Sequence, residues 1–73
     1  MPHVVVKMYP GRSNEIKENL AKKIAACVVE ELGAKPGVVS VAIEDVQPDD
    51  WMEQVYDKEI RNNENVFVKP DYE

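Results

Sequence analysis

The chain has 73 residues, a net charge of −5 and a single cysteine, Cys27, and 44% of its residues are hydrophobic. This length predicts one domain spanning residues 1–73, and no apolar run approaches the roughly 20 residues that a membrane-spanning helix needs. A chain this short buries only about 60% of its unfolded surface. Without a disulfide its core is marginal, so we expect an oligomer.

The acidic charge is concentrated in the second part of the chain. The first 43 residues carry six Lys and Arg against four Asp and Glu, whereas residues 44–73 carry three against ten. An acidic chain repels phosphate backbones, so we expect no nucleic-acid partner, and we expect no membrane association. The lone cysteine and the lack of a signal-peptide pattern favour a cytoplasmic location.

The first predicted elements are a strand and a long helix. Residues 3–9 (HVVVKMY) alternate apolar side chains on one face, which predicts a strand. Pro10-Gly11 predicts a turn, and Ser13 can cap a helix over Asn14–Leu32. Apolar residues recur there at steps of three and four, which predicts one buried stripe: Ile16, Leu20, Ile24, Cys27, Val28 and Leu32. Cys27 is therefore predicted to lie in the core, and Gly33 to end the helix.

A second strand is predicted over Val38–Val46, which completes a β-α-β unit of the α/β (α+β) class. The crossover helix makes the two strands parallel and the connection right-handed. Two strands and one helix do not form an independent core. We therefore expect a second copy of the chain to complete the sheet.

The remaining residues predict a short helix and a tail. Pro48 breaks the chain, and Asp49 can cap a helix from Asp50 to about Ile60. The short apolar run Val66–Val68 is a candidate edge strand, which we expect to pack on a partner. Asp49 and Asp50 are best explained as caps and solvated charges.

Few residues offer chemistry. His3 and Cys27 are far apart without a third metal ligand at zinc spacing, and there is no phosphate-binding or dinucleotide motif, so we expect no metal and no cofactor. Strand alternation points His3 away from the Val4 face, which favours a structural role. The three remaining candidates are Pro2, Arg12 and Trp51.

Each candidate has a plausible chemical role. Pro2 carries a free secondary amine if Met1 is removed, and such an amine is a general base suited to neutral pH. Arg12 follows Pro10-Gly11 near a helix N-terminus, where a guanidinium can grip a carboxylate. Trp51 can form the apolar wall of a small pocket. Taken singly, each of them is better explained structurally, as an edge-strand proline, a solvated loop arginine and a core tryptophan.

Together these residues resemble the 4-oxalocrotonate tautomerase family across residues 1 to about 51. The features that carry the likeness are Met1-Pro2 at the start of a strand, Gly11-Arg12-Ser13 at the family's spacing, the strand Ser40–Ile43 and an aromatic residue at Trp51. The segments Gln47–Trp51 and Lys69–Tyr72 are similar to a longer bacterial subgroup that forms homodimers. The resemblance thus implies a homodimer, with a hexamer as the alternative.

The resemblance also implies a mechanism. Pro2, freed of Met1, would act as general base and move a proton between the enol oxygen and the carbon of a small keto acid. Arg12 would bind the substrate, and Trp51 would wall the pocket. Ala42 departs from the hexameric members, which have an arginine there, and this favours a monocarboxylate substrate.

Two other functions fit the composition. One is a dimer of the same fold that binds a small anion without turnover, in which binding would depend on Arg12 and not on Pro2. The other is an interaction protein whose sheet edge takes up a partner strand through Val66–Val68. Neither explains why Pro2, Arg12 and Trp51 fall at these spacings, so we favour the tautomerase.

Overall fold

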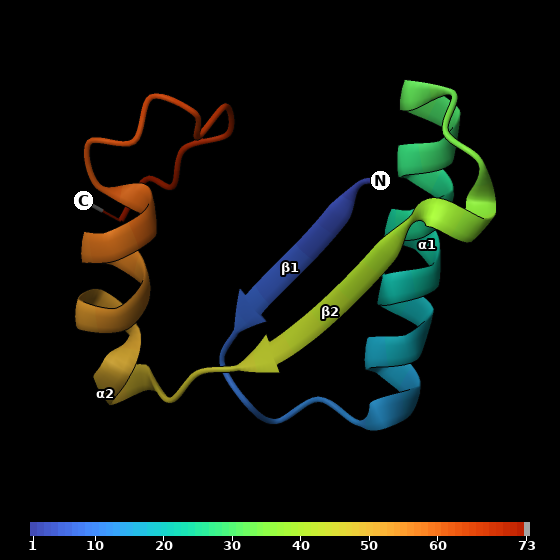
Figure 1. Ribbon diagram of the computed structural model, residues 1–73. Coiled ribbons are helices and arrows are strands. Elements are labelled where there is room, and N and C mark those ends of the chain that lie inside the picture. Colours follow the sequence, from blue (N-terminus) through green and yellow to red (C-terminus); the bar gives the residue numbers. More distant parts are fainter. Residues whose placement is uncertain (73) are drawn as a thin grey trace.

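The computed structural model describes residues 1–72 and confirms the β-α-β architecture (Figure 1). Strands β1 and β2 form a parallel two-stranded sheet, as predicted. The elements in order are β1 (His3–Met8), α1 (Asn14–Leu32), the 3-10 turn η1 (Pro36–Val38), β2 (Ser40–Asp45), α2 (Pro48–Trp51) and the π-helix η2 (Met52–Ile60). In residues 1–72 no helix is long and apolar enough to cross a membrane.

The two strands are shorter than predicted. β1 ends at Met8, one residue early, and β2 begins at Ser40 instead of Val38. The delay has a local cause, because Pro36 starts a 3-10 turn in which its carbonyl accepts a hydrogen bond from the Val39 amide at 3.4 Å. The register then pairs His3 with Ser40 and runs without a break to the pair of Met8 and Asp45.

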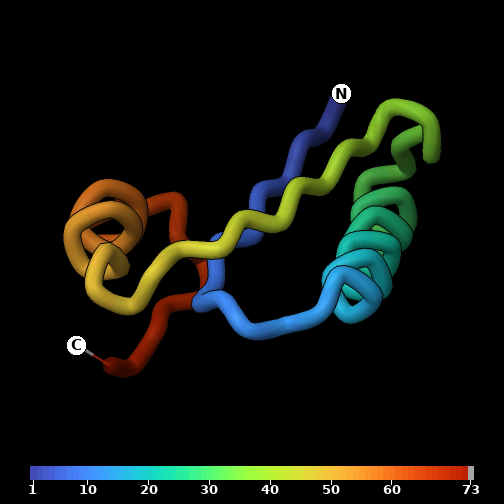
Figure 2. The backbone as a smooth tube through the Cα atoms, turned by 90° about the horizontal axis from the view of Figure 1, so that it is seen from below, coloured from blue at the N-terminus to red at the C-terminus, as the bar shows by residue number. Residues whose placement is uncertain are grey.

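Helix α1 has the predicted bounds because both of its ends are capped locally. The Ser13 hydroxyl accepts a hydrogen bond from the Ile16 amide at 3.2 Å. Gly33 takes the left-handed conformation, with φ of 67°, and its amide donates to the Val29 carbonyl at 3.0 Å. Figure 2 shows α1 running beside the strands, where it packs mainly on β2.

The prediction that Cys27 lies in the core is wrong, since its side chain is exposed. The apolar stripe of α1 is wider than the sheet beneath it. Ile24 and Val28 are half-buried over the strands, whereas Ile16 and Leu32 stay 53% and 68% exposed. Two strands cover only the middle of the stripe, so its flanks, including Cys27, remain in solvent.

The second helical segment begins earlier than predicted. Gln47, and not Asp49, occupies the N-cap, and Pro48 is the first helical residue, where its missing N–H costs nothing. Asp49 and Asp50 therefore lie inside the first turn, near the positive end of the helix dipole. The segment continues without interruption as η2, which ends where the Arg61 amide donates to the Tyr56 carbonyl at 2.8 Å.

The tail does not form the candidate strand. Residues 61–72 contain turns and bends, and Phe67 and Val68 are 91% and 89% exposed. The Asn63 side chain organises the turn, because it donates to the Glu59 carbonyl at 2.7 Å and accepts from the Asn65 amide at 2.9 Å. The edge-strand prediction for Val66–Val68 is therefore wrong within one copy, which offers no neighbouring strand at that place.

An ion pair joins η2 to the first strand: the Lys7 ammonium donates to the Glu59 carboxylate. This hydrogen bond raises the pKa of Lys7 above its ordinary value of 10.5; partial burial opposes the rise, and the charges of Glu59 and Glu44 add to it. Because the pKa of Lys7 is higher in the folded than in the unfolded chain, the ion pair stabilises the fold fully at any pH below the ordinary pKa of lysine. This stabilisation is lost as the pH rises through the folded-state pKa.

We therefore expect alkaline pH to destabilise the native protein more than a Lys7→Met variant. The Tm of the native chain should fall more steeply as the pH rises above the ordinary lysine pKa of 10.5, by a small amount because solvent screens the pair. Thermal unfolding followed by circular dichroism measures this, with Lys58→Met as the control for loss of an exposed lysine. Parallel pH profiles for the native chain and Lys7→Met would contradict the assignment.

Candidate functional site

Pro2 lies immediately before β1 and is fixed to the neighbouring strand. Its carbonyl accepts a hydrogen bond from the Ser40 amide at 3.1 Å, which extends the sheet to the second residue. Its nitrogen is joined to Met1, a residue that is 98% exposed. Loss of Met1 would therefore remove no packing and would leave a secondary amine at the end of an ordered strand.

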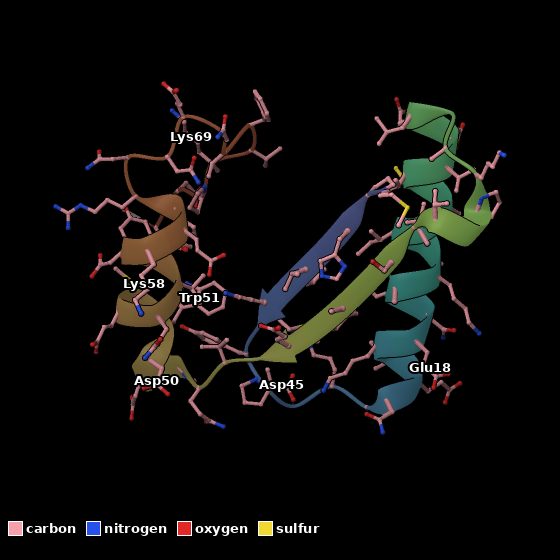
Figure 3. The ribbon with its side chains drawn as sticks, in the orientation of Figure 1. Glu18, Asp45, Asp50, Trp51, Lys58 and Lys69 are labelled. Carbon is pink, nitrogen blue, oxygen red and sulfur yellow. The ribbon has the colours of Figure 1, made fainter. Side chains whose placement is uncertain are left out.

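Arg12 and Trp51 lie near the opposite end of β1, and both contact Tyr9. The Arg12 guanidinium donates to the Tyr9 carbonyl at 3.4 Å. The Trp51 ring packs edge-to-face on Tyr9, with ring centroids 5.4 Å apart and planes at 87°. Figure 3 shows Trp51 projecting from the second helical segment toward the end of β1.

The tail completes an aromatic cluster around Trp51. The Trp51 indole N–H donates to the Tyr72 hydroxyl at 3.1 Å, and the Tyr72 ring lies 5.9 Å from the ring of Tyr56. Tyr56 is buried, together with its neighbour Val55, at 4% and 5% exposure. The cluster, formed by Tyr9, Trp51, Tyr56 and Tyr72, holds Trp51 in place and joins β1, the second helical segment and the tail.

Sequence reasoning identified Arg12 and Trp51 but not the tyrosines that hold them. Tyr9 appeared only as the end of a strand and Tyr72 only as part of a tail. The contact between Tyr9 and Trp51 spans 42 positions of the sequence, and no local spacing signals it. The sequence shows only that Tyr9 lies near the start of the chain and Tyr72 near its end, and neither position indicates a contact with Trp51.

One copy of the chain does not bring the three candidates together. Pro2 lies just before the first residue of β1, and Tyr9 lies just after its last residue, Met8 (Figure 1). Arg12 and Trp51 both contact Tyr9 and therefore lie at the far end of the strand from Pro2. Six strand residues at about 3.3 Å each place the two ends about 20 Å apart. A site that uses Pro2 with Arg12 therefore needs these residues from different copies.

A hollow in the described part of the chain lies elsewhere. It has a volume of about 530 Å³ and is formed by the end of η2 and the tail, including Tyr56, Ile60, Arg61 and Lys69. The Arg61 guanidinium also faces the Asp57 carboxylate at 3.8 Å. Pro2, Arg12 and Trp51 do not line this hollow. In residues 1–72 no cluster of three or more His, Cys, Asp or Glu side chains has a metal-binding arrangement.

The chain is similar to known tautomerases in its sequence. A family model described as tautomerase enzyme matches residues 2–61. A probable tautomerase from Xylella fastidiosa (strain 9a5c) is 44% identical over 73 residues, which covers 99% of this chain and 89% of the relative. Tautomerase PptA from Cronobacter sakazakii is 36% identical over 75 residues and covers 100% and 99% of the two chains.

Solved structures share the fold. The chain is similar to YwhB, a homologue of 4-oxalocrotonate tautomerase, with a TM-score of 0.64 and 42% identity over 66% of this chain and 79% of that chain. It is also similar to TomN, a 4-oxalocrotonate tautomerase homologue in the tomaymycin biosynthetic pathway, with a TM-score of 0.65 and 30% identity over 68% and 77% of the two chains.

Proposed function

The chain belongs to the tautomerase family, and on that premise we propose that it ketonises the enol of a small 2-keto acid, with the nitrogen of Pro2 as general base. The observation that carries the proposal is the place of Pro2, which is fixed to β2 through Ser40 and follows the exposed Met1. Removal of Met1 would make its nitrogen a base held by a strand. The chemistry uses no cofactor and no metal.

We propose that two copies build each site. Both outer edges of the sheet are unpaired in one copy, and Val5 of β1 is 43% exposed. A second β1 that runs antiparallel beside the first would bring its Tyr9 end, with Arg12 and Trp51, next to Pro2. By two-fold symmetry the same contact forms twice, so a homodimer holds two equivalent sites.

A dimer would also cover apolar surface that one copy leaves exposed. In residues 1–72 only Val55 and Tyr56 are buried, whereas Phe67 and Val68 of the tail are almost fully exposed. A chain of this size needs more burial than that to remain folded. The second helical segment and the tail are the parts that would cover the sheet of a dimer, and this favours a homodimer over a hexamer.

In this site the steps balance without a further reactant. The Pro2 nitrogen takes the proton of the enol hydroxyl, and the electron pair of that O–H bond forms the carbonyl. The electrons of the carbon–carbon double bond then take the proton back from Pro2 at carbon. Arg12 of the neighbouring copy would bind the carboxylate bidentately. Trp51 would exclude water, which disfavours the charged form of the amine and keeps it a free base.

The test is ketonisation of phenylenolpyruvate, a monocarboxylate enol, followed by ultraviolet absorbance. Intact mass must first establish that Met1 is absent from the sample. A rate well above that of buffer supports the proposal. If protein with a free Pro2 gives no such rate but is stabilised by phenylpyruvate in thermal unfolding, this substrate class is excluded and the alternative, a dimer that binds a small anion without turnover, is favoured over the enzyme.

We also propose a cytoplasmic location. The exposed thiol of Cys27 has no partner cysteine in the chain and would persist in a reducing compartment. Cell fractionation with an antibody against the chain tests this location. Recovery with a membrane or periplasmic fraction would contradict it.

A further inference from the structure

One face of the sheet is not covered by α1. Side chains alternate along each strand, so His3, Val5 and Lys7 of β1 lie on the face opposite to the half-buried Val4 and Val6. The parallel register places a residue of β2 beside each of the three, and the pairs on this open face are His3 with Ser40, Val5 with Ala42 and Lys7 with Glu44.

Most hydrogen-bonding groups of this open face are already engaged. The Lys7 ammonium is bound to Glu59 of η2. The Ser40 hydroxyl lies 2.6 Å from Nδ1 of His3, which is the distance of a short hydrogen bond. Within residues 1–72 the other ring nitrogen of His3, Nε2, forms no hydrogen bond, and the ring is exposed. Nε2 is thus a hydrogen-bonding atom on this face that remains available to a ligand.

Ser40 holds this region at two points. Its amide donates a hydrogen bond to the Pro2 carbonyl at 3.1 Å. Its hydroxyl forms a hydrogen bond with the side chain of His3, the residue that follows Pro2. A hydroxyl that donates to Nδ1 of a neutral imidazole leaves the proton on Nε2. The contact holds the orientation of the ring, and where the Ser40 hydroxyl is the donor it also places the proton on Nε2.

We propose that His3 binds the reacting oxygen of the substrate through Nε2–H and that Ser40 is the positioning residue that fixes its ring. The inference rests on the proposed function of Pro2. Consecutive Cα atoms are about 3.8 Å apart, so an enol that binds the Pro2 nitrogen from the open face of the sheet lies within reach of the His3 side chain. When Pro2 removes the enol proton, negative charge develops on this oxygen, and a fixed N–H donor stabilises it.

The chain offers matched variants for the test. His3→Gln places an amide N–H near the position of Nε2, whereas His3→Asn places one near Nδ1 and leaves nothing at the position of Nε2. We expect His3→Asn to lower kcat by about 10²-fold with little change in KM, and His3→Gln to stay within about tenfold of the native rate. Ser40→Ala should fall between them, while Ser40→Thr, which keeps the hydroxyl, should restore the rate.

A merely structural His3 predicts a different pattern. His3→Gln and His3→Asn would then lose activity equally, in proportion to a loss of Tm, and this result would overturn the proposal. Native kcat in His3→Asn would overturn it as well and would leave the role of Pro2 intact. Lys22→Ala, on the exposed side of α1, controls for changes that follow any surface substitution.

A direct measurement does not depend on turnover. His3 is the only histidine of the chain, so the ¹⁵N signals of one imidazole report its tautomer without assignment. At a pH where the ring is neutral we expect the Nε2–H tautomer in the native chain and a tautomer mixture in Ser40→Ala. Adding phenylpyruvate should shift the Nε2 signal. If the native protein shows no ketonisation, the proposed function fails, and this shift alone decides whether His3 contacts the ligand.

Discussion

Replacing Pro2 with alanine should slow ketonisation of phenylenolpyruvate by about 10²-fold, at the lower end of the 10²–10⁴-fold range for loss of a general base. The loss is incomplete because Met1 is also removed before alanine, and the new terminus still carries an amine. That amine is primary, lacks the ring and is less firmly directed. Stopped-flow ultraviolet absorbance with intact-mass control measures the rate.

A second change separates the amine from the proline ring. A short N-terminal extension that is not cleaved keeps Pro2 and every side chain but turns its nitrogen into a tertiary amide, which has no basicity and no N–H. We expect this form to lose the full 10⁴-fold contribution of the base while circular dichroism and Tm stay near native. An extended chain that ketonises the enol at the native rate would exclude Pro2 as the base.

Local chemistry explains why α1 could be predicted to the residue. Ser13 and Gly33 cap its two ends through hydrogen bonds that involve only nearby residues. The start of the second helical segment was misjudged because two local signals compete there. Pro48 fits the first helical position, so the helix begins before Asp49, which then lies in its first turn.

Two further errors concern apolar side chains that the described residues leave exposed. Cys27 belongs to an apolar stripe, but the two strands beneath α1 are too few to cover it. Phe67 and Val68 have an apolar composition that suits a strand, yet within residues 1–72 they are exposed and the sheet contains only β1 and β2. Periodicity shows which side chains favour burial, whereas the surface that buries them is set by the tertiary and quaternary arrangement.

The candidate site also has a part that the sequence predicted and a part that only the structure shows. The residue types and spacing of Pro2, Arg12 and Trp51, with the family resemblance, predicted the roles proposed for them, and these roles remain predictions. Only the structure shows that β1 separates Pro2 from the other two, and that Tyr9 and Tyr72 hold Trp51. The separation follows from the length of β1, but the sequence analysis did not use that length. The aromatic contacts required the fold.

That separation makes subunit complementation the sharpest test of the shared site. Arg12→Ala should lower kcat/KM for phenylenolpyruvate by about 10–10²-fold, because a charge-assisted contact to the carboxylate is lost. The extended chain with a blocked Pro2 should be inactive for lack of the base. Each variant alone thus has one intact half of every site and one damaged half.

When the two variants are unfolded together and refolded as an equal mixture, activity should return. In a mixed dimer, one site combines the intact Pro2 of the Arg12→Ala chain with the intact Arg12 of the blocked chain, and the other site carries both defects. Half of the dimers are mixed, so about a quarter of all sites should be native in composition. The observable is the enol ketonisation rate per chain after refolding, compared with native protein refolded in the same way.

The controls separate shared sites from trivial recovery. Each variant refolded alone must stay at its own low rate, and native protein refolded alone must recover fully. If one copy contained the whole site, the mixture would show only the average of the two variants, and the shared-site proposal would fail. A hexamer with shared sites gives the same recovered fraction, so native mass spectrometry of the refolded mixture must establish the number of chains. Recovery to about a quarter together with a two-chain mass would support the pairing in which Pro2 of one copy meets Arg12 and Trp51 of the other.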